Sequence, residues 1–402
     1  MRFVHVADVH LDTPFYGREE WLRRALRDAT RESLRRAVQW ALKEQVHVFL
    51  IAGDLFDNEL LSFGTERFLL EQLSLLDQGG ILVCYATGNH DPGQIGYRAQ
   101  EIQWPDNVIL FNTNEPRTVP IEVQGEPIGY VTGAGHSTHR EQNSLVADFP
   151  RQRLDRPHIG LIHTQIQGYL GDHKNYAPST REELLAIPVD YWACGHIHKG
   201  GQVWPEEKVY YAGNIQGRHP RETGPKGFYY GQLGEGGLEI QFVPSAPLLW
   251  EQLSCELPTE VSDFAGLTTY LQDYIIGQLA QGPQDYLVRL DLHGETPLVG
   301  ELKLEDNIRE LTEELQAACD LYWLEIRPGP LLPPLIWEDY RNQPTVLGEI
   351  LGVLEGLADD DALFAQLIPS QLASKTGDSQ TYLRELLKDL PREVVARFVA
   401  RE

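Results

Sequence analysis

Five short polar motifs constrain this chain more than any other feature of its sequence, because each directly follows an apolar run rich in β-forming residues. The motifs are Asp8-Val-His10, Gly53-Asp54-Leu-Phe-Asp57, Gly88-Asn89-His90-Asp91, His163-Thr164 and Gly195-His196-Ile-His198. In open α/β sheets, ligands gather outside the carboxyl ends of the strands. We therefore expect the five motifs to converge on one crevice.

The first 250 residues alternate short β-rich runs with helical or loop segments. The runs predict strands over residues 2–7, 46–52, 81–86, 127–131, 158–162, 191–194, 209–211 and 227–233. Helices are predicted over residues 19–43 and 65–76. Strand–helix alternation followed by a stretch of strands predicts an α/β fold with a mixed sheet. This part of the chain is predicted to form one domain, residues 1–247.

The remainder of the chain predicts two further segments. Residues 248–327 predict a small α+β domain, with strands over 250–257, 286–292 and 321–326 and helices over 261–278 and 307–318. The proline-rich stretch 327–334 predicts a break in regular structure. Residues 328–402 are therefore predicted to be a linker and a helical C-terminal tail, whose apolar residues recur at helical spacing over 346–357 and 383–398.

The motifs supply carboxylates, imidazoles and one amide carbonyl. This mixture suits a hard or borderline divalent cation with open positions better than a thiolate-bound structural zinc. The candidate ligands are Asp8, His10, Asp54, Asn89, His163, His196 and His198. They are more than one ion needs, and a carboxylate such as Asp54 can bridge two. Two ions about 3.5–4 Å apart can polarise a phosphoryl group and generate hydroxide between them.

Each motif alone has an ordinary structural interpretation. Asp8 or His10 is typical of a strand-end cap or a surface pair, and the Gly53 and Gly88 motifs are typical of turns. The Gly195 motif is more specific, because the period of a strand sends both of its imidazoles to one face. The occurrence of all five motifs, each behind a strand, favours the metal site over these separate interpretations.

The set of motifs resembles the calcineurin-like metallophosphoesterases. The longer strings beginning at Asp8, Gly53, Gly88 and Tyr191 are similar to the SbcD-type DNA repair exonucleases, and the string from Gly213 is similar to their YhaO-like branch. The resemblance of motifs covers residues 1–233. It implies a sandwich of two mixed sheets flanked by helices, followed by a small α+β capping domain and a helical tail.

The resemblance also implies roles for individual residues. Asp8, His10 and His198 would hold one ion, Asn89, His163 and His196 would hold the other, and Asp54 would bridge them. His90 would act as the general acid for the leaving oxygen, and Asp91 would orient His90. Asp57 stands where relatives carry histidine. The implied cofactor is a pair of divalent ions, with manganese as the first choice and iron, zinc or magnesium as alternatives.

The function predicted from the resemblance is a metal-dependent DNA phosphodiesterase, expected to act as an exonuclease in DNA repair. One alternative is a phosphomonoesterase or cyclic-nucleotide phosphodiesterase acting on small molecules, which would share every metal ligand. The other is a scaffold without catalysis, which the complete ligand set argues against. The net charge of −25 excludes binding of nucleic acid by bulk electrostatics. A local basic group, Lys199, Arg218, His219, Arg221 and Lys226, is a candidate for phosphate contact.

The expected partners are DNA and, by resemblance, a coiled-coil ATPase of the SbcC type, bound by residues 338–402. The alternative for this tail is that it folds back on the first domain. A homodimer is left open. The four cysteines form no CxxC pair, and no apolar run reaches about 18 residues. We therefore expect a reduced, cytoplasmic protein without a membrane span.

Overall fold

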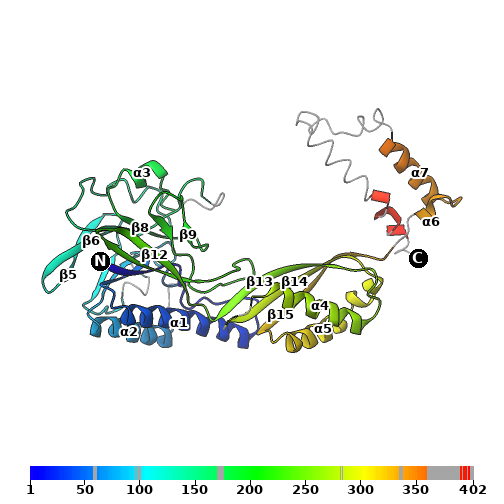
Figure 1. The fold of residues 1–402 in the computed structure, drawn as a ribbon, viewed down its shortest axis with the longest axis horizontal. Coiled ribbons are helices and arrows are strands. Elements are labelled where there is room, and N and C mark those ends of the chain that lie inside the picture. The colour runs from blue at the N-terminus through cyan, green and yellow to red at the C-terminus, as the bar shows by residue number, and fades with distance from the viewer. Residues whose placement is uncertain are drawn as a thin grey trace. The chain divides into compact units, whose positions relative to one another are not determined.

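The computed structural model describes residues 1–57, 61–94, 96, 101–169, 176–280, 282, 284–334, 338–359, 390–391, 393–395 and 397–398. The chain divides into two compact units (Figure 1). The first contains Met1–Gln252 and Gln281–Val288, and the second contains Leu253–Ala280 and Arg289–Glu402. The predicted boundaries of the segments 1–247, 248–327 and 328–402 stay a prediction.

The first unit contains two six-stranded mixed sheets. The first sheet has the order β12 (Gly237–Pro244), β11 (Gly227–Gly234), β1 (Arg2–Val6), β2 (Val48–Ala52), β3 (Leu82–Ala86) and β4 (Val108–Phe111). The second has the order β5 (Arg117–Val123), β6 (Glu126–Gly133), β7 (His158–His163), β8 (Tyr191–Gly195), β10 (Val209–Tyr211) and β9 (Gly201–Gln202). Strands β1 to β4 are parallel, as are β6, β7, β8 and β10, and the other strands are antiparallel to their neighbours.

Both faces of the first sheet are buried, which explains why its strands are almost continuously apolar. In β2, Phe49 and Ile51 face the core formed with helices α1 (Glu20–Lys43) and α2 (Phe63–Gln78). Val48 and Leu50 face the second sheet instead. The alternation follows from the period of a strand. Two mixed sheets flanked by helices are thus confirmed as the fold.

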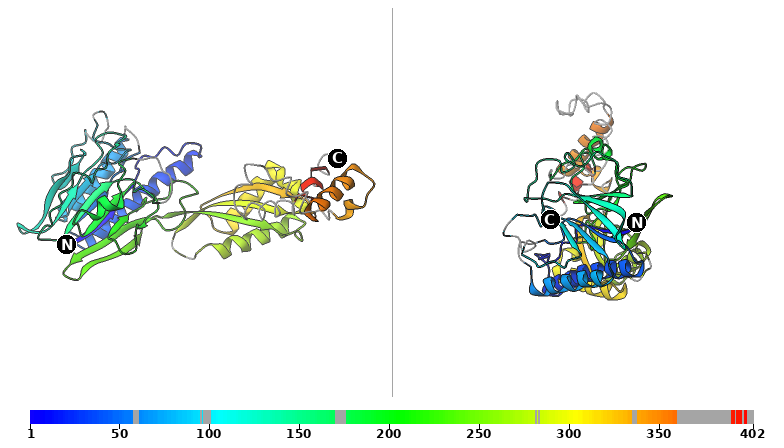
Figure 2. Two further views of the ribbon diagram at one scale, coloured as in Figure 1. Left: turned by 90° about the horizontal axis from the view of Figure 1, so that it is seen from above. Right: turned by 90° about the vertical axis from the view of Figure 1, so that its left-hand side faces the viewer.

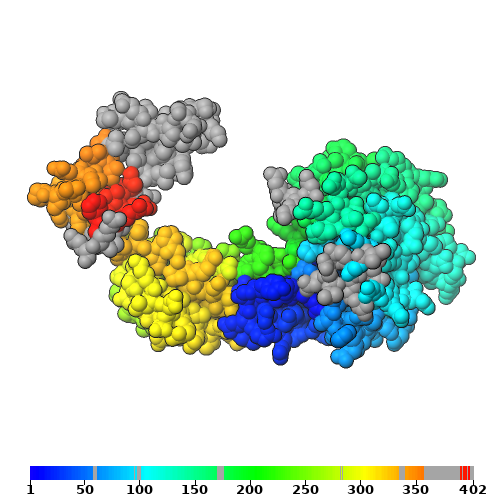
Figure 3. All heavy atoms as spheres, turned by 180° about the vertical axis from the view of Figure 1, so that it is seen from behind, coloured from blue at the N-terminus to red at the C-terminus, as the bar shows by residue number. Residues whose placement is uncertain are grey.

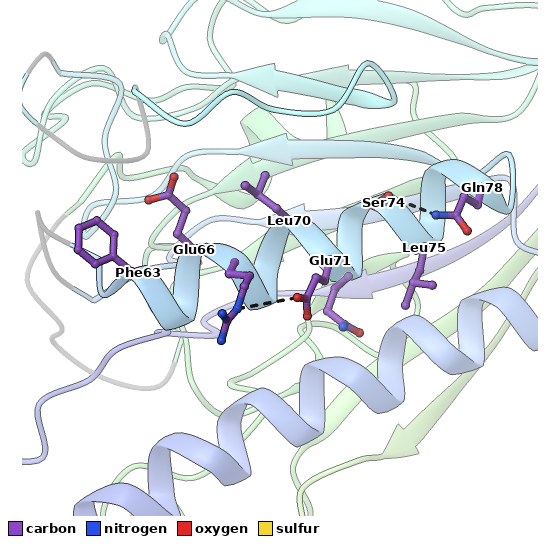
Figure 4. A pocket seen from close by; sticks show the side chains of 9 residues that line it. Phe63, Glu66, Leu70, Glu71, Ser74, Leu75 and Gln78 are labelled. Carbon is purple, nitrogen blue, oxygen red and sulfur yellow. Dashed lines mark hydrogen bonds and ion pairs between the residues drawn. The ribbon is translucent and has the colours of Figure 1, made fainter.

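Helices α1 and α2 contact each other on the outer side of the first sheet (Figure 1). Their dark blue and lighter blue atoms adjoin at the surface in Figure 3. Ser62 caps α2 by accepting a hydrogen bond from the backbone N–H of Thr65 at 3.2 Å. The outward face of α2 has a shallow hollow of about 720 Å³ between side chains such as Phe63, Leu70 and Leu75 (Figure 4). No residue of the five polar motifs lines this hollow.

A three-stranded sheet has the order β13 (Leu248–Leu257), β14 (Asp285–Glu295) and β15 (Trp323–Leu332). Leu253–Leu257 of β13, Arg289–Glu295 of β14 and all of β15 belong to the second unit. The second unit also contains the helices α4 (Phe264–Gln278) and α5 (Glu305–Ala318) (Figure 2). Side chains alternate between the two faces of β14: Leu290 and Leu292 are buried, whereas Arg289 and Asp291 form ion pairs with residues of β15. The first unit also has a short helix, α3 (Arg181–Leu185).

The prediction of irregular structure over residues 327–334 was wrong for residues 327–332, because β15 continues to Leu332. Pro328 and Pro330 are tolerated there because β15 is an edge strand. Proline has no backbone N–H to donate, and the outward backbone groups of an edge strand have no neighbouring strand to bond. Strands β4, β5, β9 and β12 were not predicted; β5 and β12 are edge strands, and many of their residues are exposed.

The described part of the C-terminal tail contains α6 (Glu338–Arg341) and α7 (Val346–Asp359). Leu347 and Leu351 of α7 pack with Val395. Most of the second predicted apolar stripe, residues 383–398, lies outside the described residues. Within the part of the chain that is described, no helix combines the length and apolar character needed to cross a lipid bilayer.

Candidate metal centre

The five motifs lie together because the strands they follow run in parallel within each sheet and end on the same side. Asp8 follows β1, Asp54 follows β2 and Asn89 follows β3 in the first sheet, while His163 ends β7 and His196 follows β8 in the second. Backbone hydrogen bonds join the first two loops: Asp8 donates to the carbonyl of Gly53 at 3.1 Å, and His10 donates to that of Asp54 at 2.9 Å.

Four of the candidate ligands have a left-handed backbone. Their φ angles are 48° for Asp8, 51° for His10, 51° for Asp54 and 106° for His196. Such conformations are unfavourable for residues with a side chain, and they tend to occur at functional sites, where the surrounding structure enforces them. They turn the side chains sharply away from the strands and toward the crevice between the sheets.

The seven candidate ligands form two groups that share Asp54. In one group, the Nε2 atoms of His10 and His198 are 3.1 Å apart, and Oδ1 of Asp8 lies 3.9 Å from Nε2 of His198. In the other, Oδ1 of Asn89 lies 3.0 Å from Nε2 of His163 and 3.1 Å from Nδ1 of His196. Oδ2 of Asp54 lies 3.8 Å from Nε2 of His10 and 3.4 Å from Nε2 of His163.

The ring tautomers show why the first group fits a cation. Nδ1 of His10 lies 3.0 Å from Asp57, and Nδ1 of His198 lies 2.6 Å from Glu222. An ionised carboxylate only accepts hydrogen bonds, so both Nδ1 atoms carry the hydrogen. Burial lowers the pKa of His10 to about 3, so that ring is neutral. The Nε2 lone pair of His10 therefore faces Nε2 of His198 at 3.1 Å, and a metal ion between the two ring nitrogens would make this arrangement favourable.

The second group leads to the same conclusion. Nδ1 of His163 donates to the carbonyl of Ala52 at 2.9 Å, so its Nε2 faces two oxygen acceptors, from Asn89 and Asp54. Although burial disfavours both charges, the two groups shift each other: the Asp54 carboxylate raises the pKa of His163, and the His163 imidazole lowers that of Asp54. The position between them therefore favours positive charge, and the nitrogen and oxygen donors suit a borderline divalent ion.

His90 lies beside this cluster, with 38% of its side chain exposed. Its backbone N–H donates to Oδ1 of Asp54 at 2.9 Å, and its Nδ1 lies 3.0 Å from Oδ1 of Asp57. Burial favours the neutral imidazole, but the hydrogen bond to Asp57 and the negative charges of Asp54 and Asp57 together raise the pKa of His90. Burial also disfavours the charged form of Asp57, but its hydrogen bonds with His10 and His90 and the charges of His10 and Arg218 together lower its pKa. Among the described residues, no group is hydrogen-bonded to Nε2 of His90.

The prediction that Asp91 orients His90 disagrees with these contacts, because Asp57 occupies that position. The carboxylate of Asp91 is buried and accepts hydrogen bonds from the backbone of Asp54, Leu55, Phe56 and Gly88 and from the hydroxyl of Tyr85. It thereby fixes the two loops that present Asp54 and Asn89. Asp91 is a structural residue of the site, one step removed from its chemistry.

The sequence profile of the family described as calcineurin-like phosphoesterase matches residues 1–200. YhaO of Bacillus subtilis (strain 168), named as an uncharacterized metallophosphoesterase, is 34% identical over 365 residues, which cover 90% of this chain and 86% of YhaO. The chain belongs to the calcineurin-like metallophosphoesterase family. The family predicted from the motifs is thereby confirmed, and so is a metal-dependent hydrolase; the narrower SbcD type stays a prediction.

This metallophosphoesterase is also similar to two archaeal proteins named DNA double-strand break repair protein Mre11. The protein from Methanopyrus kandleri is 33% identical over 292 residues, which cover 60% of this chain and 56% of that protein. The protein from Aeropyrum pernix is 40% identical over 90 residues, which cover 22% of this chain and 21% of that protein.

Two residues that position the ligands of this metallophosphoesterase were not predicted. Glu222 holds His198, and it also accepts hydrogen bonds from the side chain of Asn214 and the backbone of Arg218. His139 donates from Nδ1 to the carbonyl of Asn89 at 2.7 Å. Neither stands in a motif behind a strand, so the sequence carries no local signal for them.

Proposed function

We propose that this metallophosphoesterase is a metal-dependent DNA nuclease that acts as an exonuclease in DNA repair. The observation that carries the chemistry is a pair of ligand groups sharing Asp54, with the partly exposed imidazole of His90 beside them. The proposal that the phosphoester is DNA is supported by the similarity to the two Mre11 proteins, whose name refers to double-strand break repair.

In the proposed site, Asp8, His10 and His198 hold one divalent ion, Asn89, His163 and His196 hold the other, and Asp54 contacts both. When bound, the ions polarise the phosphoryl group and neutralise the charge that develops on it. We propose manganese as the metal, with iron, zinc and magnesium as the alternatives that the same donor set accepts.

His90 supplies the proton. The departing oxygen of a sugar is a poor leaving group, so protonation in the transition state accelerates its release. Asp57 binds the Nδ1 hydrogen of His90 and stabilises the protonated ring, which places a transferable proton on Nε2. Arg218, whose Nη1 lies 3.4 Å from Asp57, keeps this carboxylate in place.

A comparison of substrates tests the proposal. The purified full-length protein, supplied with manganese, is offered linear duplex DNA, single-stranded DNA, bis(4-nitrophenyl) phosphate and 4-nitrophenyl phosphate. We expect cleavage of DNA and of the diester, and little cleavage of the monoester. Efficient hydrolysis of the monoester with intact DNA would replace the nuclease with the small-molecule phosphoesterase.

We also propose that residues 338–402 bind a coiled-coil ATPase of the SbcC type. In α7, Val346 and Val353 are 68% and 63% exposed, which leaves apolar surface for a partner. A chain ending at Leu335 should hydrolyse bis(4-nitrophenyl) phosphate but lose binding to the ATPase. Unchanged affinity would disprove the assignment, and unfolding of the shortened chain would favour the alternative that the tail folds back.

A further inference from the structure

A pocket of about 630 Å³ opens directly beside the ligand cluster. His196 and His198 form part of its wall, and Lys199, Arg221 and Lys226 contribute cationic groups to the same wall. We call it the basic pocket. Because the candidate ligands His196 and His198 line this pocket, it is continuous with the place where the scissile phosphate would bind.

Within the described part of the protein, Lys199, Arg221 and Lys226 form no direct ion pair with a carboxylate, and Glu222 and Asp8 attract Lys226 only through space. The only carboxylate among the lining residues is Glu222, and its oxygens are engaged by His198, Asn214 and the backbone of Arg218. The arginines of α1 behave differently: Arg23 pairs with Glu20, and Arg31 pairs with Asp28 at 3.2 Å. Positive charge is thus available to a ligand in the pocket but largely cancelled along α1.

Lys226 is the most informative member of this group, since only 7% of the residue is exposed. Burying an ammonium group is costly unless it is hydrogen-bonded and paired with an opposite charge. Its Nζ donates to the carbonyl of His198 at 3.1 Å, and it has three hydrogens to donate. A buried cation with donors left over, at the wall of a pocket, is suited to an anionic ligand.

We infer that the basic pocket binds a second phosphate of the substrate, next to the phosphate that is hydrolysed. This inference rests on the proposed nuclease function and narrows it to substrates with consecutive phosphates, as in a polynucleotide strand. Arg221 provides the planar donors that match a phosphate, and Lys199 and Lys226 provide point charges. The pocket also explains how a chain with a net charge of −25 can hold an anionic substrate locally.

The direct test measures binding without turnover. Isothermal titration calorimetry in the presence of Ca²⁺ compares thymidine 3′,5′-bisphosphate with thymidine 5′-monophosphate and thymidine 3′-monophosphate. We expect the bisphosphate to bind at least about 10-fold more tightly than either monophosphate, the scale of one or two charge-assisted hydrogen bonds. In the double variant Lys199→Gln/Arg221→Gln, the tighter binding of the bisphosphate should fall to about 3-fold or less. The control Arg24→Gln alters an exposed arginine of α1 and should keep the full difference in affinity.

A kinetic test uses the 4-nitrophenyl ester of thymidine 5′-phosphate with and without a 3′-phosphate, and the 4-nitrophenyl ester of thymidine 3′-phosphate with and without a 5′-phosphate. In one of the two series, the ester with the added phosphate should have the higher kcat/KM. In the double variant, the ratio of kcat/KM with the added phosphate to kcat/KM without it should fall toward one. Equal binding of the bisphosphate and the monophosphates in the wild type, or an advantage that survives the double variant, would overturn the subsite. A preference for the bisphosphate without hydrolysis of any diester would instead disprove the nuclease and leave the subsite standing.

Discussion

The two sides of the ligand cluster are held in different ways. On the side of His163, which we call the sheet side, the ring is fully buried and its Nδ1 donates to the backbone carbonyl of Ala52 in β2. On the side of His198, the loop side, 27% of the side chain is exposed and its Nδ1 donates to the side chain of Glu222. Both arrangements fix the same tautomer, with Nε2 directed into the cluster.

The difference shows how one site combines rigidity with access. On the sheet side, the partner of the imidazole is a backbone group that no side-chain substitution removes. On the loop side, the partner is one carboxylate, and the basic pocket borders the same histidine. We therefore expect substitutions that change the packing of the sheet side to be poorly tolerated. Substitutions on the loop side should instead change metal affinity and substrate binding.

The largest loss of activity is expected from a substitution of Asp54, the residue that the two sides share. Asp54→Asn keeps a residue type that tolerates the left-handed backbone but removes the charge shared by both groups. Hydrolysis of bis(4-nitrophenyl) phosphate should fall by at least about 10³-fold, the loss that follows removal of a principal electrostatic group. Elemental analysis should find less bound metal. Asp12→Asn is the control, because Asp12 also has a positive φ, of 62°, but lies outside the cluster. Full activity in Asp54→Asn would contradict the bridging role of Asp54.

Substitution of His90 tests whether proton transfer can be lost while both sides of the cluster still bind metal. His90→Ala should keep both metals and lose about 10²- to 10⁴-fold in kcat on a substrate with an alkoxide leaving group. Asp57→Asn should lose part of the same rate, since the ring of His90 then loses its anionic partner, and should also bind metal less tightly, because Asp57 holds the ring of His10 as well. With 4-nitrophenolate as the leaving group, the defect of His90→Ala should shrink. A His90→Ala protein that no longer binds metal would refute the role of general acid.

Two glycines compare the packing of the sides directly. Gly53 and Gly224 both have positive φ, 82° and 77°, but a Cβ on Gly53 would lie 2.3 Å from Nδ1 of His163, whereas a Cβ on Gly224 would meet no atom within 4 Å. Gly224→Ala should cost about 1–2 kcal/mol of stability from backbone strain alone. Gly53→Ala should cost roughly 1–3 kcal/mol more, since His163 must move. Urea unfolding measures both, and equal costs would contradict the tight packing of the sheet side.

The smallest effect is expected on the loop side. Glu222→Gln removes the anionic partner of His198 but keeps its size, and should weaken one of the two metals by about 10- to 100-fold. The metal on the sheet side should bind as before, so calorimetry should show two separated binding steps. Glu206→Gln removes an exposed carboxylate of the same unit and serves as the control. Equal weakening of both metals would show that the sides are not independent.

The candidate ligands could be predicted to lie together because each stands at or shortly after the end of a strand, and the direction of a strand determines where the next residues lie. Their partners were not. Asp91 follows His90 in the sequence and was predicted to orient it, yet its carboxylate accepts hydrogen bonds from two loops, and Asp57, from another motif, contacts the ring. A hydrogen-bond partner is chosen by geometry in space, which sequence adjacency does not reveal.

The sequence by itself determined the class of fold and the chemistry available to this protein. Short, almost continuously apolar runs specify strands that are buried on both faces, and the carboxylates, imidazoles and amide behind them specify a site for divalent ions. Only the tertiary structure decided how those groups face one another. The left-handed backbone at Asp8 and Asp54, the pairing of Glu222 with His198 and the continuity of the basic pocket with the cluster depend on loops brought together by two sheets. These contacts join residues far apart in the chain, so no local pattern records them.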